Sequence, residues 1–218
     1  MYIQPLDISA ENETEQLQNT IEFLVSVLSS IAEFRDFESG EHVQRIQKYT
    51  QIMLHQLMET CPEYGLTKKD IRLIVQASAL HDIGKIAIPD NILMKPSKLT
   101  REEFAEIKKH TLYGCEILQK FVKKEDQFFR YCYDICRYHH ERWDGNGYPE
   151  GLKGERIPIW AQVVSIADVY DALVNKKVYK GAFDRQKAEQ MIINGKCGVF
   201  NPKIIECFRL SIWEFLNV

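Results

Sequence analysis

The sequence lacks a long apolar run, an excess of positive charge and a signal peptide. No hydrophobic stretch approaches the ~20 residues that a membrane helix requires, and the first residues do not have the charged-then-apolar order of a secretory signal. The formal net charge of −3 provides no general basic field for a nucleic-acid backbone. We therefore expect neither a membrane span nor a nucleic-acid polymer as partner, and the sequence favours a cytoplasmic protein.

Closely spaced cysteine pairs are also missing, because none of the six cysteines lies in a C-x-x-C motif. In a cytoplasmic chain such cysteines are expected to be reduced core thiols and not disulfides. Cys132 and Cys136 are four residues apart and could in principle share a metal, but small apolar packing is the simpler role. We leave them out of the predicted site.

Alternating strand patterns, internal repeats and low-complexity tracts are absent, whereas helix signals are frequent. Thr67 with Asp70, and Thr100 with Glu103, have the spacing of capping boxes at helix starts. Asn201 followed by proline is typical of another helix start. Helices are expected over residues 14–34, 42–60, 100–110, 126–140, 160–175 and 184–195, from 67 into 77–85, and from 201 onwards. The predicted fold class is all-α.

The first predicted helix, within residues 14–34, has aliphatic residues spaced by 4, 3, 4 and 3. They are Leu17, Ile21, Leu24, Leu28 and Ile31. This is the spacing of a coiled-coil seam, over only about two heptads. Two roles are open for this segment: a homodimer through residues 14–34, or an amphipathic helix that packs on its own domain.

Imidazole and carboxylate side chains cluster along the chain, and five of the six histidines lie in these clusters. Such ligands suit a first-row cation such as Fe, Mn, Co, Ni or Zn, whereas calcium would use oxygen ligands alone. The candidate ligands are Glu38, His42, His81, Asp82, His110, His139, His140 and Asp168. Because eight ligands exceed what one ion needs, we expect two or three ions.

The spacing of the ligands also favours more than one ion. Neighbours such as His81 and Asp82, or His139 and His140, diverge by ~100° on a helix, so they serve adjacent ions better than one ion. Asp168 lies in an apolar helical segment, where an unpaired charge would be costly and a metal would compensate for it.

Two motifs resemble a known family. HDIGK (81–85) is similar to the metal motif of HD-superfamily phosphohydrolases, and HHERWDGNGYP (139–149) looks like the signature of the HD-GYP subfamily. The similarity continues through IPDNILMKPSKLT, GLKGERIP and ADVYDAL, roughly over residues 35–208. It implies a bundle of about seven helices with an extended GYP loop. On this reading, residues 1–34 are a linker or dimerisation helix, and residues 35–218 are the HD-GYP catalytic domain.

The resemblance implies hydrolysis of cyclic di-GMP to pGpG and onward to GMP. Paired metals can polarise phosphate oxygens and activate water at neutral pH, and Asp82 is implied to bridge them. Lys85 is expected to place an ammonium on the phosphate or on the charge that develops in the transition state. A surface lysine that ends the helix at Gly84 is the alternative.

Glu38 is the ligand for which a solvated glutamate remains a credible alternative. It lies four residues before His42, so both side chains leave the same face if that turn is helical. The resemblance links a glutamate at this position to members that hold three metals, whereas members without it tend to hold two. Iron and manganese are the favoured ions.

The substrate-binding prediction rests on the GYP loop and one basic segment. Gly147, Tyr148 and Pro149 are implied to line the substrate pocket and to contact diguanylate cyclases, with a purely structural lid as the alternative. Lys177 stands where the family usually has an arginine, and Lys180 is retained; lysine keeps the charge but loses the bidentate fork.

Because Lys177 replaces the usual arginine, another cyclic dinucleotide, such as cyclic GMP-AMP, remains an alternative substrate. A signalling adaptor that acts through the GYP loop is the alternative outside enzymes. Because an adaptor should tolerate the loss of ligands and all the expected ligands are present, the sequence favours catalysis.

Overall fold

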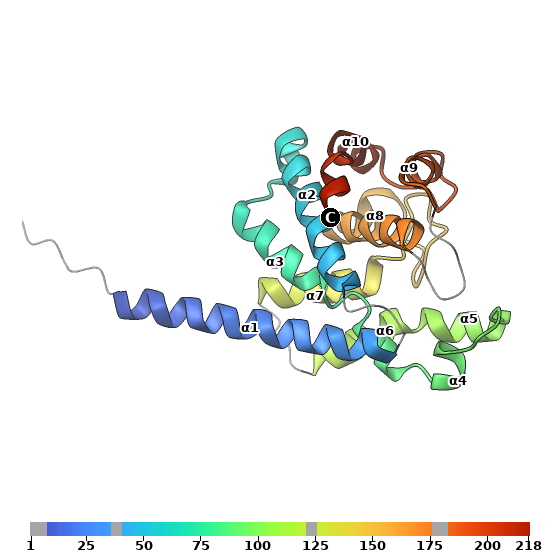
Figure 1. The fold of residues 1–218 in the computed structure, drawn as a ribbon, viewed down its shortest axis with the longest axis horizontal. Coiled ribbons are helices and arrows are strands. Elements are labelled where there is room, and N and C mark those ends of the chain that lie inside the picture. The colour runs from blue at the N-terminus through green and yellow to red at the C-terminus, as the bar shows by residue number, and fades with distance from the viewer. Residues whose placement is uncertain (1–7, 36–40, 121–125, 176–182) are drawn as a thin grey trace, which may run out of the picture.

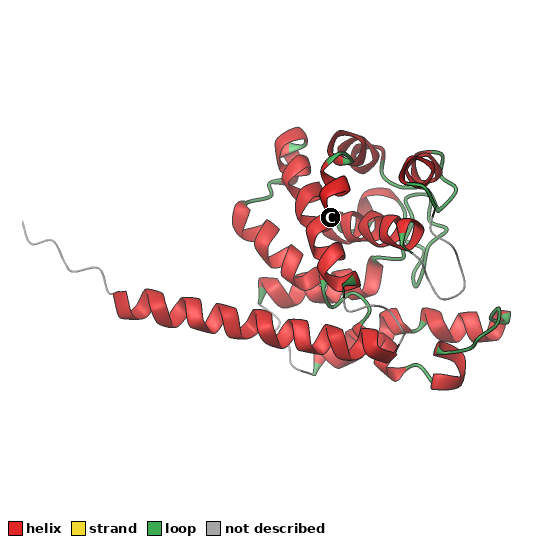
Figure 2. Cartoon of the chain, viewed as in Figure 1, coloured by secondary structure: helices red, strands yellow, loops and turns green. Residues whose placement is uncertain are grey.

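The chain is a bundle of helices in the computed structural model, which describes residues 8–35, 41–120, 126–175 and 183–218. No β-strand occurs in these ranges, so the all-α prediction is confirmed (Figure 2). The helices are α1 (Ile8–Arg35), α2 (His42–Thr60), α3 (Lys68–Ser78), α4 (Asp90–Leu93), α5 (Arg101–Lys108), α6 (His110–Gln119), α7 (Gln127–Tyr138), α8 (Ile159–Val174), α9 (Arg185–Ile193) and α10 (Pro202–Ser211). These labels exceed the seven implied by the resemblance because α1 precedes the predicted catalytic domain, α4 is a single turn, and only Lys109 separates α5 from α6.

Short 3₁₀ helices connect some of these elements: η1 (Pro62–Tyr64), η2 (Ile83–Ala87), η3 (Gly154–Arg156) and η4 (Glu214–Asn217). No helix in the described ranges is both long enough and apolar enough to cross a membrane. The six cysteines are free thiols, and only Cys197 is not buried, in agreement with the predicted packing role.

The predicted helix starts are confirmed by their caps. The Thr67 side chain accepts a hydrogen bond from the Asp70 amide, and Asp70 accepts one from the Thr67 amide at 2.9 Å. Thr100 and Glu103 form the same reciprocal pair at the start of α5. Asn201 caps α10. These local hydrogen bonds stabilise helix ends regardless of the tertiary fold, which is why the sequence predicts them well.

The centre of the bundle consists of α2 and α8. Ile46, Met53, Leu54 and Leu57 of α2 are fully buried, as are Val163, Val164 and Ile166 of α8. Each such side chain contributes about 1.5–3 kcal/mol through the removal of apolar area from water. Because α2 begins with His42 and α8 carries Asp168, the core fixes the elements that bear these candidate ligands.

The predicted helix through HDIGK is wrong, because α3 ends at Ser78 and η2 begins only at Ile83. The backbone tightens there: the amides of Leu80 and His81 bond to carbonyl oxygens three residues back. A close contact requires this departure, since a Cβ on Gly84 would lie 1.9 Å from the His110 carbonyl oxygen. Lys85 is therefore on a 3₁₀ turn beside α6 and not on the helix that precedes His81.

Helix α1 runs along one side of the bundle and projects beyond it (Figure 1). Its buried face consists of Val25, Ser29, Ala32 and Glu33. The predicted seam lies on another face: Leu17, Leu24, Leu28 and Ile31 are between 47% and 62% exposed, and Ile21 is partly buried. The helix thus packs on its own domain without using most of the predicted seam.

Candidate metal centre

Three buried histidines each place Nδ1 against a backbone carbonyl oxygen. The Nδ1 atoms of His81 and His110 lie 2.9 and 2.7 Å from the carbonyl oxygen three residues earlier, and Nδ1 of His139 lies 2.8 Å from the one four residues earlier. A carbonyl oxygen only accepts, so each Nδ1 carries a proton and Nε2 is the nitrogen left to bind a metal. A backbone acceptor behind the ring is the usual support of a metal-binding histidine.

The ligand atoms converge around Asp82. Its Oδ1 lies 3.1 Å from Nε2 of His110 and 3.6 Å from Nε2 of His139, and those two nitrogens are 3.5 Å apart. Nε2 of His81 lies 3.4 Å from the other carboxylate oxygen of Asp82, Oδ2. Several buried imidazole nitrogens thus converge on one carboxylate, and imidazole and carboxylate donors suit a first-row divalent metal.

The donors form two groups, each with ligand atoms within 4.8 Å of one another. One group consists of Asp82, His110, His139 and His140, and the other of His42, His81 and Asp82. Asp82 belongs to both groups. This is the arrangement expected where one carboxylate serves two adjacent ions.

The adjacent histidines differ from the expectation that they would serve different ions. His139 and His140 fall in the same group, with ring centroids 4.0 Å apart. His139 is the C-cap of α7, still with helical backbone angles, and His140 lies in the turn that follows. Both rings reach the group that contains Asp82, so the ~100° divergence between neighbours does not separate their ligand atoms.

His42 is oriented by a carboxylate that the sequence reasoning missed. Its Nδ1 lies 2.8 Å from Oδ2 of Asp171, whose other oxygen accepts a 2.6 Å hydrogen bond from Nε of Arg45. Burial would raise the pKa of Asp171, but the hydrogen bonds from His42 and Arg45 outweigh it and keep the pKa below its usual value. The available signal was the second aspartate of ADVYDAL, three residues after Asp168.

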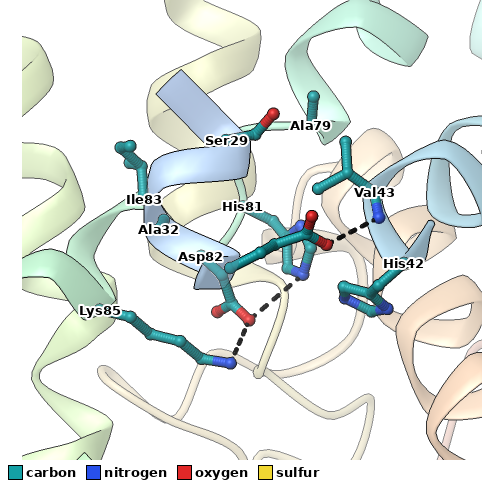
Figure 3. Close-up of a pocket in the computed structure, with 10 residues that line it drawn as sticks. Ser29, Ala32, His42, Val43, Ala79, His81, Asp82, Ile83 and Lys85 are labelled. Carbon is teal, nitrogen blue, oxygen red and sulfur yellow. Dashed lines mark hydrogen bonds and ion pairs between the residues drawn. The ribbon is translucent and has the colours of Figure 1, made fainter. Parts of the chain in front are cut away.

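Cationic side chains balance the charge of Asp82. Burial alone would lower the pKa of His81, but Asp82 and then Asp168 raise it to about 9, so His81 is protonated at neutral pH and must release that proton to bind a metal. Lys85 Nζ lies 2.8 Å from Oδ2 of Asp82, and Figure 3 shows this ion pair as a dashed line. Despite burial, Lys85 and His81 hold the pKa of Asp82 well below its usual value, so this carboxylate is ionised.

His139 and His140 are held neutral. Burial is the main cause that lowers the pKa of both, and at His140 the charges of neighbouring imidazoles lower it further. Because only a neutral imidazole has a lone pair for a metal, both rings are ready to act as ligands near neutral pH.

The GYP loop packs directly on this centre. The Tyr148 ring stacks on His140 with centroids 4.6 Å apart, and Pro149 follows it through a cis peptide. A Cβ on Gly147 would lie 2.4 Å from the Glu141 Cα, so only glycine fits. The buried Glu141 carboxylate accepts the backbone amides of Glu150 and Leu152 at 2.8 and 3.0 Å and so shapes the loop.

Asp168 is the one described candidate ligand outside the two groups. It is half-buried, and its charge reaches His81. Glu38, Lys177 and Lys180 lie outside the described residues. The structure thus brings together six of the eight predicted ligands, and the roles of the residues remain predictions.

Comparisons with known proteins agree with the motifs. The family model described as HD domain matches residues 26–204. A cyclic di-GMP phosphodiesterase of Vibrio cholerae serotype O1 is 39% identical over 96% of this chain and 43% of its own length. A 3′3′-cGAMP-specific phosphodiesterase 2 of the same organism is 38% identical over 100% of this chain and 40% of its own length.

A solved structure has the same fold. It is a cyclic GMP-AMP specific phosphodiesterase of V. cholerae, with a TM-score of 0.63 and 18% identity over 90% of this chain and 50% of that one. The chain thus spans about half the length, or less, of the proteins it resembles. An HD domain implies a divalent metal site, and the two His and Asp groups are residues that could hold it. The chain belongs to the HD domain family, within its HD-GYP subfamily.

Proposed function

We propose that this chain is the catalytic part of a metal-dependent phosphodiesterase that hydrolyses cyclic di-GMP to pGpG and onward to GMP. The observation that carries the proposal is Asp82, which belongs to both ligand groups and pairs with Lys85. The similarity to a protein named cyclic di-GMP phosphodiesterase supports the substrate.

Each predicted residue has a proposed role in the reaction. Two or three divalent ions, iron or manganese, would polarise the phosphate oxygens and supply an activated water. Asp82 bridges the two groups, and the Lys85 ammonium faces the phosphate or the charge that develops on it. The further ligands are Glu38, His42, His81, His110, His139, His140 and Asp168, with Glu38 assigned to a third ion.

The substrate is held by the GYP loop and by two lysines. Tyr148, stacked on His140, offers an aromatic face beside the centre, and Gly147 and Pro149 fix its backbone. Lys177 and Lys180 would contact the phosphates. Cyclic GMP-AMP is the second candidate substrate, because a relative named as specific for it is 38% identical over the whole chain.

The function is tested by parallel turnover of cyclic di-GMP and cyclic GMP-AMP with protein purified without oxygen. Asp82→Ala should lower kcat on the preferred substrate at least 100-fold, since one carboxylate would be lost from both groups. Circular dichroism should show that the variant keeps its helices. Turnover retained by a folded Asp82→Ala variant, or none by the metal-loaded parent, would favour the adaptor alternative.

We also propose two protein partners. A second copy of the chain would pair in parallel along the seam of α1, which keeps coiled-coil spacing and exposes four of its five aliphatic residues. A diguanylate cyclase would meet the GYP loop. The cytoplasmic location remains a prediction.

A further inference from the structure

The last two turns of α1 reach the candidate metal centre. Ser29, Ala32 and Glu33 of α1 line a small pocket together with His42 and His81. Figure 3 shows Ser29 and Ala32 on the α1 ribbon above His81 and Asp82. Glu33 is only 7% exposed, so a carboxylate from the N-terminal helix is buried beside two predicted ligands.

Glu33 caps the helix that begins with His42. Its Oε1 accepts a 2.9 Å hydrogen bond from the amide of Val43, in the first turn of α2. That turn contains no acidic residue of its own, and the side chain of Glu41, the N-cap residue, makes no capping hydrogen bond. A carboxylate at a helix N-terminus is favourable because it satisfies an amide and complements the helix dipole. The placement of His42 therefore depends on a side chain from α1.

The charge of Glu33 has a second effect. A buried carboxylate is costly unless a cation or several hydrogen bonds compensate for it. Asp82 and Lys85 also line the pocket, so Glu33 is a second carboxylate against one ammonium where His42 and His81 converge. This second carboxylate favours a divalent cation in the group formed by His42, His81 and Asp82.

Arg35, at the end of α1, binds the segment that follows Asp82. Its Nη1 donates to the carbonyl oxygens of Lys85, at 3.3 Å, and Ile86, and its Nη2 donates to that of Ile88 at 3.0 Å. It also pairs with Asp90. These contacts hold η2, which follows Asp82 and carries Lys85. One helix end thus fixes both the start of α2 and the segment that bears the shared carboxylate.

We propose that Glu33 is a positioning residue of the metal centre, through which the placement of α1 sets the affinity for the metal. The proposal rests on the proposed function only in requiring that the His and Asp groups bind a divalent ion. It holds whichever cyclic dinucleotide is the substrate.

The test is a calorimetric titration of metal-stripped protein with Mn²⁺, which measures the dissociation constant of each variant. Glu33→Gln keeps an oxygen that can accept from Val43 but removes the charge, so its affinity for Mn²⁺ at the weakened site should fall by about 10–100-fold. Glu33→Asp keeps the charge and should bind Mn²⁺ more tightly than Glu33→Gln. Glu41→Gln is the matched control: it removes an exposed charge at the same helix start and should leave the affinity unchanged.

The outcomes separate the positioning role from a structural one. If folded Glu33→Gln and Glu33→Ala both bind Mn²⁺ like the parent, the residue is only a helix cap and the proposal is overturned. A loss in Glu33→Ala alone would support positioning through the hydrogen bond to Val43 and refute the effect of the charge. An equal loss in Glu41→Gln would also overturn it, since any charge near α2 would then suffice. Melting of each metal-stripped variant shows whether it folds. If Glu33→Gln does not fold, Glu33→Asp tests the position of the carboxylate: its shorter side chain should weaken the hydrogen bond to Val43 and lower the affinity for Mn²⁺ below that of the parent. A parent that binds Mn²⁺ but hydrolyses no cyclic dinucleotide would refute the proposed function and leave this proposal intact.

Discussion

The partly buried carboxylate of Asp134 lowers the free energy of unfolding at neutral pH. Its Oδ2 accepts a 3.2 Å hydrogen bond from Nε1 of Trp160, and burial raises its pKa to about 6 from the usual 3.8. The folded state therefore binds this proton more tightly than the unfolded chain does. Above about pH 6 the charged side chain lowers the free energy of unfolding, and this penalty disappears as the pH falls from about 6 towards 4.

Asp134→Asn should thus raise the free energy of unfolding at pH 7 by on the order of 1–2 kcal/mol, because the amide carries no charge to bury and can still accept from Trp160. At pH 4 the variant and the parent should differ little. Urea unfolding at both pH values measures this, with Glu116→Gln as a control that removes an exposed charge. An equal gain at pH 4 and pH 7 would contradict the assignment of the titration to Asp134.

Helix α1 is the element whose role the sequence left most open. Four of the five seam residues stay exposed on the monomer and are available to a second copy, and their aliphatic spacing is self-complementary in a parallel pair. Leu24→Glu should convert a dimer into a monomer at micromolar concentration, because it places a charge in the seam. Light scattering measures the mass directly.

Ser30→Glu is the control for this prediction. Ser30 is exposed on α1 but lies outside the 4-3-4-3 spacing, so the same new charge should leave the dimer intact. A parent chain that is monomeric at these concentrations would refute the pairing. So would a dimer that survives Leu24→Glu.

Elements also show where sequence reasoning succeeds and where it stops. Capping boxes involve side chains three residues apart, so Thr67 and Thr100 could be assigned from the sequence alone. The end of α3 could not be assigned in this way, because it depends on the close contact of Gly84 with His110, which belongs to another helix. The same limit applies to the support of His42: Asp171 is 129 residues away in sequence, and only the fold brings the two together.

At the scale of the whole molecule, the two ligand groups connect segments that are far apart in sequence. His42 begins α2, Asp82 lies between α3 and η2, His110 begins α6, and His139 and His140 follow α7. The motifs identify which residues could bind, since HD and HHE-x-x-DG-x-GYP are local patterns. The arrangement of the donors into two groups that share Asp82 exists only in the folded chain, because the fold brings these distant segments together.

Metal removal should therefore destabilise the whole bundle. An ion that binds only the folded chain stabilises it by RT ln(1 + [L]/Kd), which is about 2.7 kcal/mol when the free metal is 100 times Kd. We expect the melting temperature to fall after chelation under anaerobic conditions and to rise again with the logarithm of added Mn²⁺. Asp82→Ala, which weakens both groups, should respond much less to Mn²⁺ at the same concentrations. A melting temperature that is the same for stripped and reloaded protein would show that the donors are only a buried polar cluster, and the phosphodiesterase proposal would lose its physical basis.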